Sequence, residues 1–399
     1  MLHLPGGQPP NPRPEPQARK ARRTGNARQI SVNTHLRRAA VVVAAVSTAV
    51  GLAACGKAKE AGGGDHKKDA KGALTIGLLL PENQTARYER FDKPLIEKKI
   101  KELAGTSATV LYENAKQDAS LQQQQVDTMI TKRVDVLIVD AVDAKSIASS
   151  VKKADDKGIP VVAYDRLAEG PVKAYTSVDN ERVGKIQGES LLKELGDNAG
   201  KGEIVMMNGS VTDPNAKMYK DGAHSVLDGK VKIGKEYDTK EWKPENANEN
   251  MKGAISSLGK DHIVGVYSAN DGMAGGIITA LKSAGFDRLP PVTGQDAELS
   301  AVQRILAGEQ FMSVYKPYQP EADAVATLAV NLAQGKKLDN VAKATVDSGT
   351  QKKIPSIIVD PFALTKADIA KYVGKPGFFT LDEICTAKYK AECDKAGLK

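Results

Sequence analysis

Acidic, basic and amide side chains follow several apolar runs of this sequence. The run Ile159–Tyr164 contains Val-Val-Ala and ends directly on Asp165 and Arg166, and Asn270 and Asp296 follow later apolar runs in the same way. Successive apolar residues are typical of a strand buried on both faces of a parallel sheet, and ligands bind beyond the carboxyl ends of such strands. An Asp-Arg pair at that place is either a structural ion pair or a set of directed donors and acceptors for a polar ligand.

The stretches 134–166 and 263–296 repeat one pattern. Each runs from a strand through a polar strand end, a helix and a glycine break to a second strand that ends on Asp. The polar residues at the two strand ends lie 25 residues apart in the first stretch and 26 in the second. Two similar lobes facing each other would place both terminal acids, Asp165 and Asp296, at one cleft. This repetition favours a ligand site over two unrelated ion pairs.

The chemistry available at this cleft favours binding over catalysis. Asp165 and Asp296 could form a pair of carboxylates for proton transfer, but Arg166 and other cations would hold them ionised, which suits acceptance of hydroxyl hydrogen bonds. Beyond residue 73 the only histidines are His224 and His262, and no metalloprotease, serine-hydrolase, phosphate-loop or dinucleotide motif is present. We therefore predict a protein that is not an enzyme and needs no cofactor or metal.

The candidate cleft residues combine planar polar groups with aromatic faces. Such a set matches a ring of hydroxyl groups, because amides, carboxylates and guanidinium groups bond the hydroxyls and aromatic rings cover the C–H surfaces. Trp242 alone could equally be a half-exposed packing residue, although its position just before a predicted helix favours the cleft. The residues predicted to contact the ligand are Arg90, Phe91, Asp165, Arg166, Asn215, Trp242, Asn270, Asp296 and Lys316.

Alternating short apolar runs and longer amphipathic stretches predict the elements that position these residues. The pattern indicates an α/β fold of two doubly wound parallel-sheet lobes. Asp92 is expected to cap a helix with Pro94 in its first turn, and Gly275-Gly276 indicates close helix packing. Strands are expected at 74–80, 108–112, 134–139, 159–164, 202–207, 231–237, 263–267 and 291–295. Helices are expected at 92–104, 118–132, 143–157, 181–195, 214–228, 244–259, 271–284 and 298–308.

The basic charge of the chain is concentrated near its N-terminus. The 399 residues carry 57 Lys and Arg against 49 Asp and Glu, a formal net charge of +8. Residues 1–54 hold eight of those bases and one acid, which leaves 49 bases and 48 acids in residues 55–399. The body is therefore nearly neutral, and its charge does not indicate a nucleic-acid partner.

The first 72 residues resemble an export leader with a tether. An apolar run at 39–54 follows two arginines and is shorter than the roughly 20 residues of a membrane span, so 1–54 is predicted to be a signal peptide. It ends in Leu-Ala-Ala-Cys, which resembles the lipobox of bacterial lipoproteins and implies a lipid on Cys55; a lone buried cysteine is the alternative. Residues 55–72 predict a flexible tether, and hence a protein anchored at the extracytoplasmic face of the cell membrane.

Cys385 and Cys393 are the two remaining cysteines. An exported chain makes a disulfide between them plausible. On one straight helix their Cα atoms would be about 12 Å apart, whereas a disulfide needs roughly 4.4–6.8 Å. We predict the disulfide, with a bend in the chain between the two residues.

Seven segments of the chain, taken in order, are similar to the sugar-binding proteins of bacterial ABC importers. The resemblance covers residues 73 to about 365 and is to the ribose/galactose-type periplasmic binding family, in particular its D-xylose-binding members. It implies that the polar candidates hydrogen-bond a monosaccharide between Phe91 and Trp242. Phe91 stands where the xylose binders have Trp, and Pro214 where they have Asn, so the exact sugar is open. The segments are Arg87–Phe91, Ala163–Arg166, Asp213–Lys217, Trp242–Ala247, Ser268–Asp271, Gly294–Ala297 and Val314–Pro317.

The resemblance also implies an architecture and a mechanism. The lobes would be joined by a three-strand hinge of type I, would close over the sugar, and would then dock on an ABC permease with its ATPase. The chain would act as a monomer. The expected crossings are near 177–181, 316–318 and 355–357, with an N-terminal lobe of 73–178 plus 317–355 and a C-terminal lobe of 179–316 plus 356–399.

Two other functions share this fold. A sensory lipoprotein that presents its sugar to a histidine kinase or chemoreceptor fits the same sequence. A LacI-type repressor would need an N-terminal helix-turn-helix, and the chain carries an export signal there instead.

Overall fold

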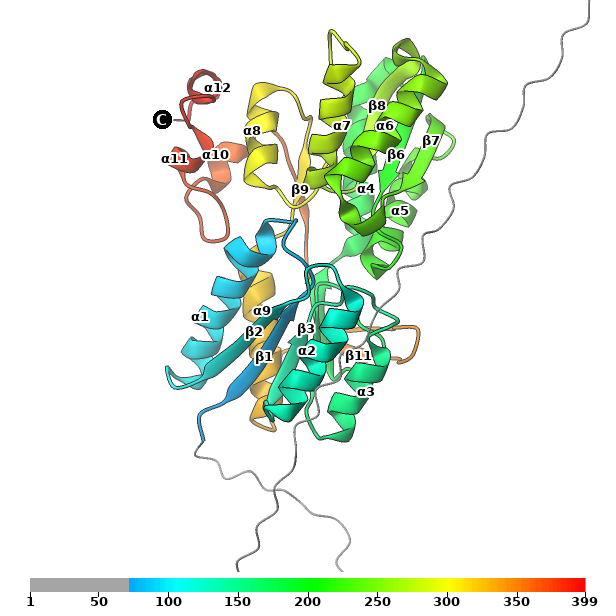
Figure 1. The fold of residues 1–399 in the computed structure, drawn as a ribbon. Coiled ribbons are helices and arrows are strands. Elements are labelled where there is room, and N and C mark those ends of the chain that lie inside the picture. The colour runs from blue at the N-terminus through cyan, green and yellow to red at the C-terminus, as the bar shows by residue number, and fades with distance from the viewer. Residues whose placement is uncertain (1–71, 399) are drawn as a thin grey trace, which may run out of the picture. The chain divides into compact units, whose positions relative to one another are not determined.

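The computed structural model describes residues 72–398, which form two α/β lobes (Figure 1). The predicted signal peptide, the lipidation residue Cys55 and the tether up to residue 71 lie outside the described residues. Within 72–398, no helix combines the length and the apolar character needed to cross a bilayer.

The first lobe is built on a seven-stranded sheet. Neighbouring strands are parallel except at one edge of the sheet, where the strands at 344–346 and 354–359 are antiparallel. The central strands consist almost wholly of buried residues, as expected for a sheet covered on both faces. In order across the sheet the strands are β10 (Ala344–Val346), β11 (Ile354–Val359), β5 (Ala174–Val178), β4 (Val161–Tyr164), β3 (Val136–Val139), β1 (Thr75–Leu80) and β2 (Thr109–Asn114).

Helices cover both faces of this sheet (Figure 1). Leu78 of β1 is buried against α1 and α9, whereas Leu79 is buried on the opposite face against α2. Alternate side chains of a strand point to opposite faces, so one strand contributes to both cores and the lobe is doubly wound. The helices are α1 (Lys93–Ala104), α2 (Ala119–Thr131), α3 (Ala148–Asp156) and α9 (Tyr318–Ala333).

A parallel three-stranded sheet, in the order β7 (Lys232–Asp238), β6 (Glu203–Asn208) and β8 (Ile263–Ser268), forms the centre of the second lobe. The prediction of a strand at 291–295 is wrong, because only isolated bridges form there, at Val292 and Gln295. Pro290 and Pro291 lack the N–H groups that a ladder requires, which explains the interruption. A separate antiparallel pair joins β9 (Ser313–Tyr315) to β12 (Phe362–Leu364).

The helices of the second lobe pack in close pairs. A Cβ atom at Gly276 would lie 2.1 Å from the carbonyl oxygen of Pro244, and one at Gly184 would lie 1.9 Å from that of Tyr219. The interpretation of Gly275-Gly276 as a packing feature is therefore confirmed. The helices are α4 (Asn180–Leu195), α5 (Pro214–Leu227), α6 (Pro244–Leu258), α7 (Asp271–Ser283) and α8 (Leu299–Ala307), with single turns η2 (Gly196–Asn198), η3 (Lys240–Trp242) and η4 (Lys260–His262).

Two expected helix starts differ from the structure. The helix expected at 143–157 begins only at Ala148, because Asp143 accepts hydrogen bonds from the N–H groups of Lys145 and Ser146 and forms a turn instead. Asp92 does not cap α1, because a π-helical turn, η1 (Tyr88–Asp92), runs into that helix without a break. The Asp92 carboxylate instead pairs with Arg87 at 2.8 Å.

The C-terminal segment folds as three short helices, α10 (Ile369–Tyr372), α11 (Leu381–Ile384) and α12 (Lys390–Lys395). A disulfide joins Cys385 to Cys393 with Cα atoms 5.9 Å apart, and the break between α11 and α12 provides the bend that this distance requires. The expected domain boundary at 355 falls inside β11, whose pairing with β5 continues through Val359. The division into lobes at the expected residue numbers remains a prediction.

Candidate functional site

A small cavity of about 20 Å³ lies where the carboxyl ends of strands from both lobes meet. It is lined by seven of the predicted contact residues, namely Asp165, Arg166, Asn215, Trp242, Asn270, Asp296 and Lys316. Five other residues, Thr85, Tyr88, Asp213, Tyr219 and Gln295, line it as well. Tyr88 and Asp213 belong to segments that carried the family resemblance, and Gln295 precedes Asp296, but nothing in the sequence distinguished them from their neighbours.

Asp165 is the acceptor that the first lobe contributes. It follows β4 directly, and its backbone is left-handed with φ of 51°. The hydroxyl of Tyr175 donates to its carbonyl oxygen at 2.8 Å, which holds this strained conformation in place. Its Oδ2 accepts a hydrogen bond from the Tyr88 hydroxyl at 3.1 Å and lies 3.6 Å from Arg87 Nη1.

The cations around Asp165 keep it ionised although it is buried. Burial opposes the charged form, but Lys316, Arg87 and Arg166 outweigh this effect and lower the pKa of Asp165 to about 2. Asp165 is therefore a charged hydrogen-bond acceptor at neutral pH, and it has no proton to give. This agrees with the prediction of binding rather than acid-base chemistry.

Lys316 links acids from the two lobes. Its Nζ lies 3.0 Å from Asp296 Oδ1 and 3.7 Å from Asp165 Oδ1, and the side chain is 3% exposed. Burial lowers the pKa of Lys316, but the two carboxylates raise it further, so the net shift is upward and the amine is charged. Asp165 and Asp296 therefore lie at one site, as the repeated sequence pattern predicts, although no regular strand precedes Asp296.

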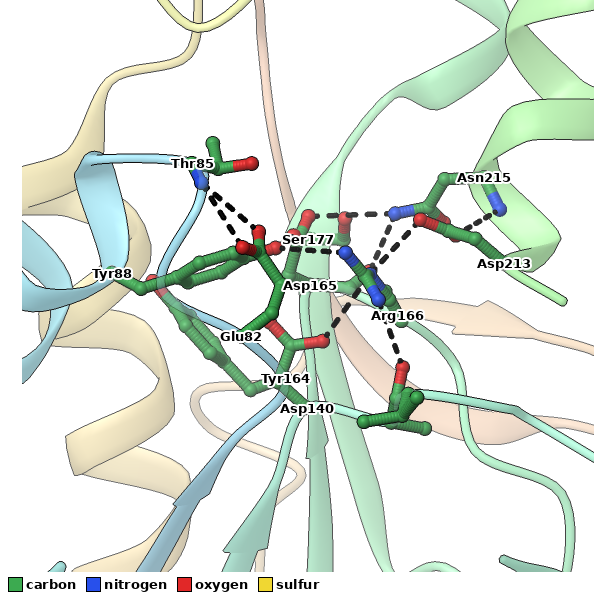
Figure 2. Close-up of polar contacts among 12 residues, drawn as sticks. Glu82, Thr85, Tyr88, Asp140, Tyr164, Asp165, Arg166, Ser177, Asp213 and Asn215 are labelled. Carbon is green, nitrogen blue, oxygen red and sulfur yellow. Dashed lines mark hydrogen bonds and ion pairs between the residues drawn. The ribbon is translucent and has the colours of Figure 1, made fainter. Parts of the chain in front are cut away.

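A second group of contacts crosses the cleft at Asp213 (Figure 2). This carboxylate caps α5 by accepting from the N–H of Asn215 at 2.8 Å, and it also accepts from the indole N–H of Trp242 at 3.2 Å. Arg166 of the first lobe approaches it to 2.9 Å through Nε. Asn215 in turn donates from Nδ2 to the carbonyl oxygen of Asp165 at 3.2 Å. Asp213 therefore fixes the positions of three predicted contact residues, Arg166, Asn215 and Trp242.

Trp242 and Asn270 are held by their own lobe. Trp242 is 6% exposed, and its ring lies edge-on to Tyr219 at 6.3 Å. A Cβ at Gly209 would come within 2.0 Å of the indole ring, so only glycine permits this placement. Asn270 uses Oδ1 to cap α7 at the N–H of Met273, which leaves its amide nitrogen for a ligand.

The structure does not bring Arg90 and Phe91 to the cavity. Arg90 forms an ion pair with Glu383 of α11, and its side chain is 47% exposed. Phe91 stacks on Tyr318 with ring centroids 5.1 Å apart and meets Phe379 edge-on. The turn η1 presents Tyr88 to the cavity, whereas Arg90 and Phe91 contact the C-terminal segment. Contact of these two residues with a ligand remains a prediction.

The cavity is too small for a sugar as it stands. Ligand pockets typically measure roughly 300–1,000 Å³, whereas about 20 Å³ holds little more than one water molecule. The lobes also touch at the rim, where the N–H of Ala144 donates to the carbonyl oxygen of Thr212 at 3.3 Å. The structure thus shows the lobes closed together, and a ligand must separate their side chains to enter.

Comparison with known proteins identifies the family. Residues 76–337 match the model of the periplasmic binding protein domain. The D-xylose-binding periplasmic protein of Haemophilus influenzae is 34% identical over 325 residues, which cover 80% of this chain and 93% of the relative. The multiple sugar-binding periplasmic receptor ChvE of Rhizobium radiobacter is 32% identical over 330 residues, which cover 78% and 92%.

A solved structure agrees with these sequence matches. The solute-binding protein of an ABC transporter from Clostridium phytofermentans, with bound β-D-glucose, superposes with a TM-score of 0.71 at 26% identity. The match covers 78% of this chain and 99% of that one. The expected fold class is confirmed, and the relatives are substrate-binding proteins rather than enzymes. The chain therefore belongs to the periplasmic binding protein family, among its sugar-binding members of the ABC transporter type.

Proposed function

We propose that this protein is an extracytoplasmic lipoprotein that captures a monosaccharide, D-xylose or a related pentose, and delivers it to an ABC permease and its ATPase. In this proposal Cys55 carries the lipid anchor at the membrane. The names of the sequence relatives support a sugar ligand, and the lipobox-like Leu-Ala-Ala-Cys supports the anchor.

The convergence of both lobes on one charged cluster is the observation that carries this function. Asp165 and Asp296 come from different lobes and lie 3.7 and 3.0 Å from the Lys316 amine. Ionised acceptors and a cationic donor at fixed positions suit a ring of hydroxyl groups, and Trp242 offers an apolar face beside them. A sugar that bonds groups of both lobes would favour the closed form, which is the form that a permease would recognise.

The proposed contacts are the seven predicted residues that line the cavity. Asp165, Asp296 and Asn215 would accept hydrogen bonds from hydroxyl groups, while Lys316, Arg166 and the Asn270 amide would donate them. The open lobes would admit the sugar, and closure by hinge motion would surround it.

Calorimetric titration of the protein with a panel of pentoses and hexoses tests this function. We expect binding of D-xylose or a close relative in the micromolar range, which corresponds to roughly −8 kcal/mol. Glycerol serves as a control polyol without a ring. If no sugar of the panel produces a binding isotherm, the sugar-binding proposal is wrong for this chain.

A further inference from the structure

Arg166 has two acidic neighbours that belong to different lobes. Its Nε lies 2.9 Å from Asp213 Oδ2, across the cleft, and 3.7 Å from Asp140 Oδ1, in its own lobe (Figure 2). Asp140 directly follows β3, the strand that pairs with β4 in the seven-stranded sheet. Asp213 caps α5 in the second lobe. Separation of the lobes therefore removes one of these partners from Arg166 and leaves the other.

Asp140 is poorly compensated while the lobes are closed. The residue is fully buried, and neither oxygen of its carboxylate accepts a hydrogen bond. Burial of a carboxylate without such bonds costs free energy, and the guanidinium beside it is already engaged at the shorter distance with Asp213. In the closed form, therefore, the guanidinium group of Arg166 pairs with Asp213 of the opposite lobe and leaves Asp140 without a close ion pair.

The backbone of Asp140 cannot follow the second lobe. Its N–H donates to the carbonyl oxygen of Leu79 at 3.0 Å, and its carbonyl oxygen accepts from Gln122 Nε2 at 2.6 Å. Both partners belong to the first lobe, in β1 and α2. Asp140 and Arg166 are consequently carried on adjacent strand ends of one rigid sheet, whatever the position of the second lobe.

We propose that Asp140 is a positioning residue that pairs with Arg166 when the lobes are open and so opposes their closure in the absence of a ligand. This inference rests on the proposed sugar-binding function and deepens it. When the lobes close, Arg166 leaves Asp140 and pairs with Asp213. The hydrogen bonds that the sugar forms then compensate for the free energy of the lost Asp140–Arg166 pair. Closure thereby becomes conditional on the ligand, and release of the sugar to a transporter is easier.

The charges around Asp140 give the exchange a pH dependence. Arg166 and Asp165 face it from the end of β4, Arg87 and the Tyr88 hydroxyl from the start of η1, and Asp213 from the second lobe. In the closed form burial raises the pKa of Asp140 well above its usual range, Asp165 adds to the rise, and the two arginines oppose it. A pairing with Arg166 in the open form would keep the pKa lower, so closure takes up a proton and a fall in pH favours the closed, sugar-bound form.

The variant Asp140→Asn tests this role by removing the charge and keeping the shape. We expect D-xylose, or whichever sugar of the panel binds, to bind roughly threefold to tenfold more tightly than to the wild type. The pH dependence of that affinity between pH 6 and 8 should become shallower. Asp156→Asn, which changes an exposed acid of α3, is the control and should alter neither quantity. Weaker or unchanged sugar binding by Asp140→Asn would overturn the proposal.

A measurement without sugar separates this inference from the proposed function. The N–H of Ala144 bonds to Thr212 across the rim, so its hydrogen exchange reports opening of the lobes. Exchange at Ala144 should be slower in sugar-free Asp140→Asn than in the wild type, and unchanged exchange would refute the role of Asp140 even if no sugar is ever found to bind. Asp140→Leu should give the same result and replaces the Asn variant if that one does not fold.

Discussion

Asp165 is a buried carboxylate that stays charged, and the groups around it explain why. Lys316, Arg87 and Arg166 oppose the cost of burial, and the Tyr88 hydroxyl adds a hydrogen bond. A charged acceptor with lone pairs still free binds hydroxyl groups more strongly than a neutral one. The residue is therefore suited to fix the orientation of a sugar, and its removal would also leave the surrounding cations without their partner.

The substitution Asp165→Ala should weaken sugar binding by at least about 2 kcal/mol, or roughly 30-fold in the dissociation constant, because buried donors lose their acceptor. Calorimetric titration against the wild type measures this loss. Asp156→Ala removes an exposed acid that pairs with Lys152 and should leave the affinity unchanged. An affinity equal to that of the wild type would remove Asp165 from the binding site.

The pairs of helices in the second lobe set the positions of the site residues that they carry. The helix α7 begins at Asp271, directly after Asn270, and α6 begins at Pro244, two residues after Trp242. The two helices meet at Gly276, where a Cβ would lie 2.1 Å from a backbone oxygen of α6. Backbone cannot yield as a flexible side chain can, so any larger residue must push the helices apart.

The variant Gly276→Ala should accordingly lower the free energy of unfolding by about 1–3 kcal/mol, despite the higher helix propensity of Ala. Urea unfolding followed by circular dichroism measures the change. Gly272 lies in the first turn of the same helix, and a Cβ there has its nearest atom at 3.7 Å. Gly272→Ala should thus be neutral or slightly stabilising. Equal stability of both variants would show that α6 and α7 are not packed as described.

At the scale of the whole molecule, several buried acids hold their protons unusually tightly. Burial raises the pKa of Glu321 and of Glu298 to about 8, and that of Asp271 to about 7, although Arg87 or Arg304 opposes the shift in each case. A carboxyl group with a raised pKa in the folded state binds its proton more tightly there than in the unfolded chain. Such groups destabilise the fold above their unfolded pKa of about 4. The penalty is full above the raised pKa and shrinks steadily as the pH falls from that value toward about 4.

The protein should therefore be more stable at pH 6 than at pH 8.5. Urea unfolding at the two pH values should differ by roughly 1–2 kcal/mol in the free energy of unfolding. The variant Glu321→Gln keeps the shape of the side chain next to Arg87 and removes its titration, so the difference should shrink. If the wild type is less stable at pH 6, or if the variant shows the full difference, this assignment of the raised pKa values is wrong.

Anchoring of the whole protein is a separate prediction that concerns residues outside the described part. In a bacterial host the chain should incorporate radiolabelled palmitate and fractionate with membranes, because a diacylglycerol on Cys55 supplies two buried acyl chains. Cys55→Ala should lose the label and leave the membrane fraction, while the export signal is unchanged. Labelling of the Cys55→Ala variant would contradict the proposed lipidation site.

The sequence by itself determined the features that depend on near neighbours. Unbroken apolar runs predicted β1, β3 and β4, and the amphipathic pattern at 118–132 predicted the helix α2. The repeat of strand, polar end, helix and strand predicted two similar lobes, and it paired Asp165 with Asp296 at one cleft, where Lys316 joins them. These features follow from hydrophobic period and spacing, which local sequence contains.

Only the tertiary structure decided which side chains of a segment reach the cavity and which acid meets which base. The π-helical turn η1 changes the direction of successive side chains, so Tyr88 lines the cavity while Arg90 pairs with Glu383, nearly three hundred residues later. The exchange proposed for Arg166 likewise depends on acids in two lobes, at positions 140 and 213. Such pairings arise because closure of the lobes brings distant segments together, and burial then assigns each charge a partner that no local pattern specifies.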